Sequence, residues 1–135
     1  MTLAALAPEL ITLFREAGFT ADGIAAHLGP NATEAMHRGE PAAVRYVASD
    51  DSLLSRLIRF FVLRDALPAT ALADLVGASL ATRLLDAGAV RADRSGTVTP
   101  VLDIRPHVIV GENRWIFSDA DASMTQHVPG PDHVL

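Results

Sequence analysis

The chain has 135 residues, half of them hydrophobic, so it is long enough for one domain with its own core and too apolar to be disordered throughout. It has no cysteine, which excludes disulfides, thiolate zinc sites and a cysteine nucleophile. Its 11 basic residues are all arginine and its acidic residues number 16, which gives a net charge of −5. Neither half of the chain therefore has the dense basic surface of a protein that binds duplex nucleic acid on its own.

The first 64 residues predict short helices. Pro8 suits the first turn of a helix, where its missing N–H costs nothing, and Gly18 stands where that helix should be capped. Thr20 is placed to cap a second helix, which the Gly29-Pro30 pair ends. Pro41 then opens another short helix. This part therefore reads as a helical subdomain.

Residues 52–64 give the clearest helix of the chain. Ser52 and the aspartates before it favour a helix N-terminus, because short acceptors and negative charge stabilise the first turn. The segment is apolar nearly all round, which is typical of a helix buried between others. Phe60 and Phe61 are therefore expected at the centre of the core rather than in a ligand pocket.

The next elements fit a helix-turn-helix. Residues 68–76 and 79–87 each predict a short helix, separated by Gly77, and Gly88 ends the second one. A short strand at 90–92 and a turn at 93–96 follow directly.

Strand signals fill the rest of the second half. Residues 97–104 alternate and are rich in β-branched side chains, with Pro100 expected at an edge or a bulge. Residues 108–110 and 115–117 form a further hairpin. The predicted fold class is α+β, with an N-terminal helical subdomain at 1–64 followed by a winged-helix-like unit with an additional β-hairpin at 65–118.

The tail at 119–135 changes character. It begins with polar residues and contains the breaker cluster Pro129-Gly130-Pro131, so it reads as a linker. We expect residues 1–118 to form a single accessory domain and residues 119–135 to lead toward a missing catalytic domain.

Candidate contact residues are few. The helix at 79–87 offers only Arg83, beside Asp86, to read bases, so it is a poor recognition helix. The strands and turns are better supplied and carry the candidate contacts to RNA, to an acidic protein or to phosphate: Arg91, Arg94, Arg105 and Arg114. The alternative is that these arginines are solubilising charges partnered by Asp93, Asp103 and Glu112.

No catalytic, cofactor-binding or metal-binding residue is predicted. No two of the five histidines have the i, i+4 spacing of a helical zinc site, and there is neither a Gly-x-Ser-x-Gly motif nor a glycine-rich phosphate loop. An independent enzyme is thus not predicted. The absence of a long apolar run or a basic N-terminal region suggests a cytoplasmic chain without a membrane partner.

Five stretches of the sequence carry a resemblance to known proteins: Arg15-Glu16-Ala17-Gly18-Phe19-Thr20-Ala21-Asp22-Gly23, Leu28-Gly29, Arg38-Gly39-Glu40-Pro41, Leu102-Asp103-Ile104-Arg105-Pro106 and Pro131-Asp132-His133-Val134-Leu135. Together they resemble the N-terminal region of a family of S-adenosylmethionine-dependent methyltransferases from high-GC bacteria. In that family a Rossmann-like catalytic domain with an Asn-Pro-Pro-Tyr-type motif follows, akin to enzymes that methylate release-factor glutamine or nucleobase amino groups. This chain lacks that motif and the glycine-rich cofactor segment, so no catalytic residue carries over.

The resemblance implies a non-catalytic domain of a methyltransferase. It would use no cofactor itself, whereas its parent would use S-adenosylmethionine. Its partners would be the C-terminal methyltransferase domain of the same chain and a protein or RNA substrate, which it would help to recognise. Two alternatives stay open: a stand-alone winged-helix regulator that binds nucleic acid, and a protein-interaction or dimerisation module.

Overall fold

A computed structural model describes residues 2–119 and 133–134. The helices are α1 (Leu3–Ala17), α2 (Ala21–His37), α3 (Pro41–Val47), α4 (Leu53–Leu57), the π-helix η1 (Ile58–Val62), α5 (Ala69–Val76) and α6 (Ala78–Asp86). The strands are β1 (Leu67–Pro68), β2 (Val90–Ala92), β3 (Thr97–Pro100), β4 (Leu102–Ile109), β5 (Glu112–Asp119) and β6 (His133–Val134). Helices come first and small sheets follow, which confirms the α+β class.

The strands form two antiparallel sheets, with the orders β1-β3-β2 and β4-β5-β6. In the first sheet, Leu67 of β1 pairs with Val98 of β3, and Val90 of β2 pairs with Pro100 of β3. In the second, β4 and β5 pair along eight residues each, from Leu102 opposite Asp119 to Ile109 opposite Glu112. We call β2, β3 and their connecting turn the wing, and β4 with β5 the ribbon.

The helices α5 and α6 followed by the wing give the winged-helix order predicted from the sequence. A strand that the sequence analysis did not find, β1, completes the sheet by pairing with β3. The preceding helix, α4 with η1, contacts α5 and β3, and β1 follows it after residues 63–66. The division at residue 64 therefore falls between elements that pack on one another.

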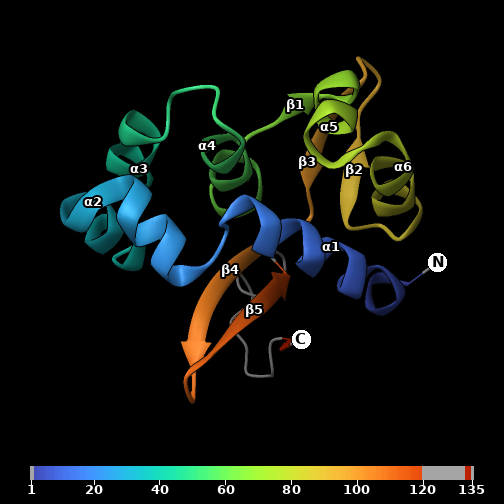
Figure 1. The fold of residues 1–135 in the computed structure, drawn as a ribbon. Helices are drawn as coiled ribbons and strands as arrows, with labels where there is room; N and C mark the ends of the chain where they lie inside the picture. The colour runs from blue at the N-terminus through green and yellow to red at the C-terminus, as the bar shows by residue number, and fades with distance from the viewer. Residues whose placement is uncertain (1, 120–132, 135) are drawn as a thin grey trace.

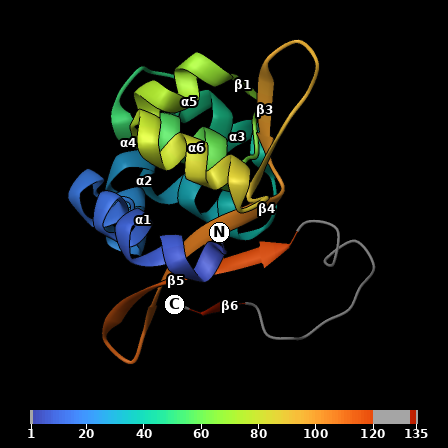
Figure 2. The same ribbon diagram turned by 90° about the vertical axis from the view of Figure 1, so that its right-hand side faces the viewer.

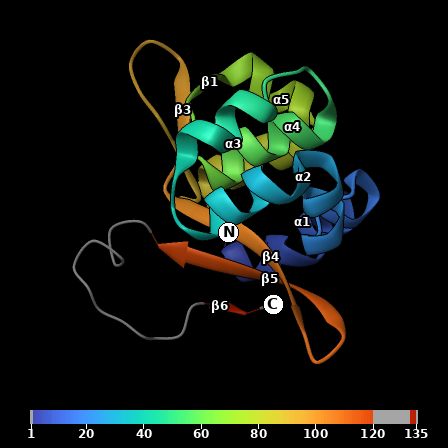
Figure 3. The same ribbon diagram turned by 90° about the vertical axis from the view of Figure 1, so that its left-hand side faces the viewer.

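Helix α4 lies near the middle of the molecule in Figure 1, with α2 and α3 on one side and α5 and α6 on the other. Helix α1 passes below α6, and the ribbon lies below α1. The turn of the wing and the turn of the ribbon project at opposite ends of the molecule, as Figures 2 and 3 show from two sides.

Aromatic side chains form the centre of the core. Phe61 is 1% exposed, and its ring centroid lies 5.4 Å from that of Phe14 and 5.0 Å from that of Phe60. Trp115 of the ribbon is also buried, and its indole N–H donates to the carbonyl oxygen of Phe19 at 2.8 Å. The prediction that Phe60 and Phe61 are core residues is confirmed.

Helix α1 differs from expectation at Pro8, whereas Gly18 and Gly29 interrupt the helices where the sequence predicted. Helix α1 begins at Leu3, capped by the side chain of Thr2, so Pro8 lies inside the helix and not in its first turn. Pro8 and Ala4 are both exposed, so water can bind the Ala4 carbonyl that lacks its helical donor. In α2, Gly29 adopts the non-helical φ 82° and ends a first helical segment, as the Gly29-Pro30 pair predicted, and a second segment runs from Pro30 to His37.

The segment at 97–104 is not one strand. Val101 forms a bend that divides it into β3 and β4, which belong to different sheets. The Val101 N–H donates to the Ala89 carbonyl at 2.9 Å instead of extending the ladder. Pro100 pairs with β2 on one side and lies beyond the end of β1 on the other, so it occupies a local edge as expected.

The tail predicted as a linker contains the last residue of β5 and the short strand β6. Asp119 is the last residue of β5, and β6 pairs with β5 through Val134 opposite Ile116 and His133 opposite Phe117. The sequence analysis did not predict β6, because the local polar composition carries no signal for pairing with a distant strand. Residues 120–132 of the predicted linker, which include His127, and residue 135 lie outside the described residues.

Candidate functional site

The wing ends in a turn that Asp93 fixes. Its Oδ1 accepts hydrogen bonds from the Ser95 N–H at 2.9 Å, the Ser95 hydroxyl at 2.6 Å and the Thr97 N–H at 3.1 Å. The Ser95 hydroxyl, and then the Thr97 N–H, lowers the pKa of the Asp93 carboxyl. Asp93 therefore holds the backbone of the turn and does not partner an arginine, contrary to the pairing considered from the sequence.

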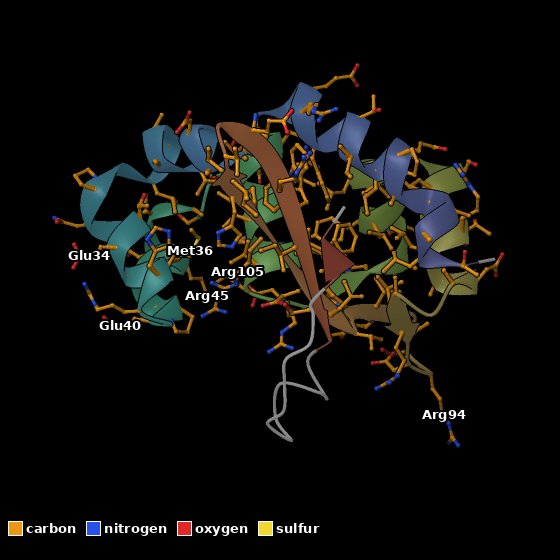
Figure 4. All side chains as sticks on the ribbon, turned by 90° about the horizontal axis from the view of Figure 1, so that it is seen from below. Glu34, Met36, Glu40, Arg45, Arg94 and Arg105 are labelled. Atoms are coloured by element: carbon orange, nitrogen blue, oxygen red, sulfur yellow. The ribbon has the colours of Figure 1, made fainter. Side chains whose placement is uncertain are left out.

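Arg91 and Arg94 lie on this wing. Within residues 2–119, neither has a carboxylate oxygen within 4.0 Å of a guanidinium nitrogen. Both are exposed, and Figure 4 shows Arg94 extending from the wing turn away from the body. Both side chains are therefore open to solvent and form no ion pair within the described part of the chain.

Arg105 and Arg114 lie on the ribbon and are paired. Arg105 donates to Asp103 at 3.2 Å and to the Met36 carbonyl at 3.4 Å, and Arg114 donates to Glu112 at 2.8 Å. In Figure 4, Arg105 lies toward α2, on the opposite side of the molecule from Arg94. The four sequence candidates therefore do not form one surface: two are on the wing, and two are ribbon residues with the carboxylate partners that the alternative interpretation named.

The second helix of the helix-turn-helix is engaged within the chain. Arg83 of α6 donates to the carboxylate of Glu9 on α1, and this hydrogen bond lowers the pKa of Glu9. Helix α1 packs against α6. The single arginine of this helix is thus neutralised by a residue 74 positions away, and the helix face beside it is occupied by α1.

A serine, a histidine and an aspartate also meet, which the sequence analysis did not find. The Ser55 hydroxyl lies 2.7 Å from His27 Nε2, and Asp50 Oδ1 lies 3.9 Å from the same nitrogen. In a nucleophilic triad the carboxylate orients the other ring nitrogen and the hydroxyl faces substrate. Here both partners share Nε2, and Ser55 is fully buried, so the group ties α2 to α4 rather than forming a nucleophile.

Hydrogen bonds connect Asp50, Ser52 and Ser55 at the N-terminus of α4. The Ser55 hydroxyl lowers the pKa of Asp50, with smaller contributions from the Ser52 hydroxyl and from His27. The Ser52 side chain caps α4 by accepting from the Ser55 N–H, as the sequence predicted for this position. The polar residues before α4 are therefore accounted for by helix capping.

The described residues contain neither a metal-binding cluster nor a helix that could span a membrane. No three histidine or acidic side chains there are grouped so that they could hold a metal ion. None of the helices described between residues 2 and 119 combines the length and the apolar character needed to cross a bilayer.

Comparison with known proteins gives a family without a known activity. No curated protein and no solved structure matches the chain. Residues 16–101 match the family described as "Domain of unknown function (DUF7059)", a match that takes in the helices from α2 to α6 and the whole wing. Because the match covers more than half of the sequence, the chain belongs to the DUF7059 family.

Proposed function

We propose that this chain is a non-catalytic N-terminal domain of an S-adenosylmethionine-dependent methyltransferase, and that it presents its wing to a structured RNA substrate. The methyltransferase part of this proposal is based on the sequence resemblance. The observation that carries the substrate contact is the wing itself: Arg91 on β2 and Arg94 in the turn braced by Asp93 have no carboxylate partner among the residues that the structure describes. Contacts remote from the reacting group can position a substrate for transfer.

The contacts of α6 within the chain favour this proposal over a stand-alone DNA-binding regulator. A recognition helix must enter the major groove with donors aimed at base edges. In this chain Arg83 is bound to Glu9, and α1 packs against the same helix. An RNA contact through the wing requires neither the face of α6 nor a wide basic surface, which agrees with the net charge of −5.

RNA retention by charge-reversal variants tests the wing. We expect the chain to bind structured RNA with a Kd in the non-specific range, roughly 10⁻⁴ to 10⁻⁶ M, and with a shallow salt dependence because only a few phosphates are neutralised. Arg91→Glu/Arg94→Glu should abolish retention. The matched control, Arg56→Glu/Arg114→Glu, changes the net charge by the same amount away from the wing and should retain measurable binding.

Two results would contradict the wing contact. Tight binding untouched by Arg91→Glu/Arg94→Glu would place the contact elsewhere, and no detectable binding by the wild type would point to a protein-facing module. The methyltransferase part is tested separately by calorimetric titration with S-adenosylmethionine. We expect no micromolar binding by this chain, whose described strands are all antiparallel and so lack the strand-turn-helix crevice of a dinucleotide-type site. The longer natural protein containing it should bind.

A further inference from the structure

A hollow opens on one face of the wing, beside the bend at Val101. Its volume is about 290 Å³. Arg91 and Asp93 line it on one side, and Thr97, Thr99 and Val101 line it on the other. Ligand pockets in proteins begin at about 300 Å³, so the hollow has room for one flat ring system but not for a large cofactor.

Strand pairing explains why these side chains share a face. Arg91 of β2 lies directly opposite Thr99 of β3, and opposed residues of an antiparallel pair project to the same side of the sheet. Thr97, two residues before Thr99, projects to that side as well, whereas Val98 between them projects to the other side and is fully buried. Because Arg91 and Thr99 are both exposed, this face of the wing is turned toward solvent.

The bend gives the hollow an apolar wall that a ligand can reach. The Val101 N–H donates to the Ala89 carbonyl, and the chain then continues as β4 in the other sheet instead of extending β3. Val101 is half-buried and Ala92 is exposed, and both line the hollow. Part of its accessible surface is therefore apolar.

The polar groups of the hollow include both donors and acceptors. Arg91 supplies guanidinium N–H donors and has no carboxylate oxygen within 4.0 Å among the residues that the structure describes. The Thr99 hydroxyl can donate and accept. The three hydrogen bonds to Asp93 described above all end on Oδ1, so Oδ2 is an acceptor, and the carboxyl is ionised at neutral pH because the Ser95 hydroxyl lowers its pKa. The hollow thus offers hydrogen bonds of both kinds beside an apolar wall.

We infer that this hollow receives one unpaired base of the RNA that the wing contacts. Each of the four bases is a flat ring with at least one donor and one acceptor on its edge, so its face can cover Val101 while its edge pairs with Thr99 and Asp93. Arg91, which is exposed, would bind the phosphate of the same nucleotide. A phosphate alone fits less well inside the hollow, because it would face the ionised Asp93 and leave Val101 uncovered. The inference rests on the proposed RNA contact and adds a base to it.

Two RNA hairpins with the same stem separate recognition of the base from recognition of the phosphates. One hairpin is capped by a loop of uridines, and the other has a loop of equal length whose ribose-phosphate backbone lacks the bases. Fluorescence anisotropy measures the Kd of each hairpin for the wild-type chain. Contacts to one base contribute on the order of tenfold in affinity, so we expect the uridine-loop hairpin to bind about tenfold more tightly than the abasic one. The backbone amide NMR shifts of Thr97 and Thr99 should change more with the uridine-loop hairpin.

Thr99→Val removes the hydroxyl and keeps a β-branched side chain of nearly the same shape. It should weaken binding of the uridine-loop hairpin about threefold to tenfold, the range for one lost hydrogen bond, and leave the Kd of the abasic hairpin unchanged. Thr12→Val is the matched control, since Thr12 is an exposed threonine of α1, and it should change neither Kd.

Equal Kd values of the two hairpins for the wild type would overturn the base site and leave the phosphate contact of the wing standing. So would an unchanged Kd of the uridine-loop hairpin in Thr99→Val, or an equal loss of affinity for both hairpins in that variant. The absence of binding by either hairpin would contradict the proposed RNA contact itself, and the base site with it.

Discussion

Phe61→Ala should be among the most destabilising single substitutions in this chain. The side chain is 1% exposed, and its ring lies 5.4 Å from Phe14, 5.0 Å from Phe60 and 6.5 Å from Phe19, measured between centroids. Truncating a buried phenylalanine costs about 3–5 kcal/mol through lost transfer free energy and the cavity that remains. Edge-to-face partners such as Phe14 and Phe60 add to this, so we expect about 4–5 kcal/mol.

Urea unfolding followed by tryptophan fluorescence measures this loss. Trp115 is the single tryptophan, and its ring lies 6.4 Å from that of Phe14 in the same cluster, so its emission reports on this core. Tyr46→Ala is the control: Tyr46 is 83% exposed, and its removal should change the free energy of unfolding by less than about 0.5 kcal/mol. If Phe61→Ala proves too unstable to study, Phe61→Leu should show a smaller loss with the same sign. A loss below about 1 kcal/mol for Phe61→Ala would refute the packing argument.

Two further predictions concern the ribbon. Val110 is 95% exposed and has φ 52° in the two-residue turn Val110-Gly111, where positive φ at both positions favours asparagine followed by glycine. Val110→Asn should therefore raise the free energy of unfolding, measured in urea, by about 0.5–1 kcal/mol. A lower free energy of unfolding in this variant would contradict the argument. Burial, followed by the charges of His37 and Arg105, lowers the pKa of His107, so the unfolded chain binds this proton more readily and stability should fall as the pH drops below about 6.5. In His107→Gln the change in urea midpoint between pH 7 and pH 5 should be smaller than in the wild type, and an unchanged pH dependence would show that His107 is not its source.

The sequence predicted best where a local rule decides the structure. Gly77 and Gly88 adopt positive φ at the ends of α5 and α6, as expected for residues that end short helices. The helix at 52–64 was predicted correctly because a helix that is apolar nearly all round is stable only when it is buried in the core. Its last turn adopts the π form over 58–62, which no residue pattern in the segment indicates.

Elements fixed by distant contacts were missed. Strand β1 is two residues long and includes Pro68, so it has no strand signature of its own, and its existence depends on pairing with Val98. The bend at Val101 likewise depends on the carbonyl of Ala89. Local composition carries no trace of either contact.

The candidate site shows the same division. The pairs Asp103 with Arg105 and Glu112 with Arg114 are two residues apart on a strand and so share a face, a spacing that favours the partnered interpretation for these arginines. The bond between Glu9 and Arg83 joins α1 to α6 across most of the chain, and one sequence cannot predict it.

The bend at Val101 also determines how the two projecting hairpins are connected. A single residue separates the last residue of β3 from the first residue of β4, and its N–H donates to the carbonyl of Ala89, the residue before β2. A one-residue connection that is itself hydrogen-bonded leaves little freedom between the two strands. We therefore expect a substitution that alters the backbone at Val101 to change the orientation of the ribbon relative to the wing.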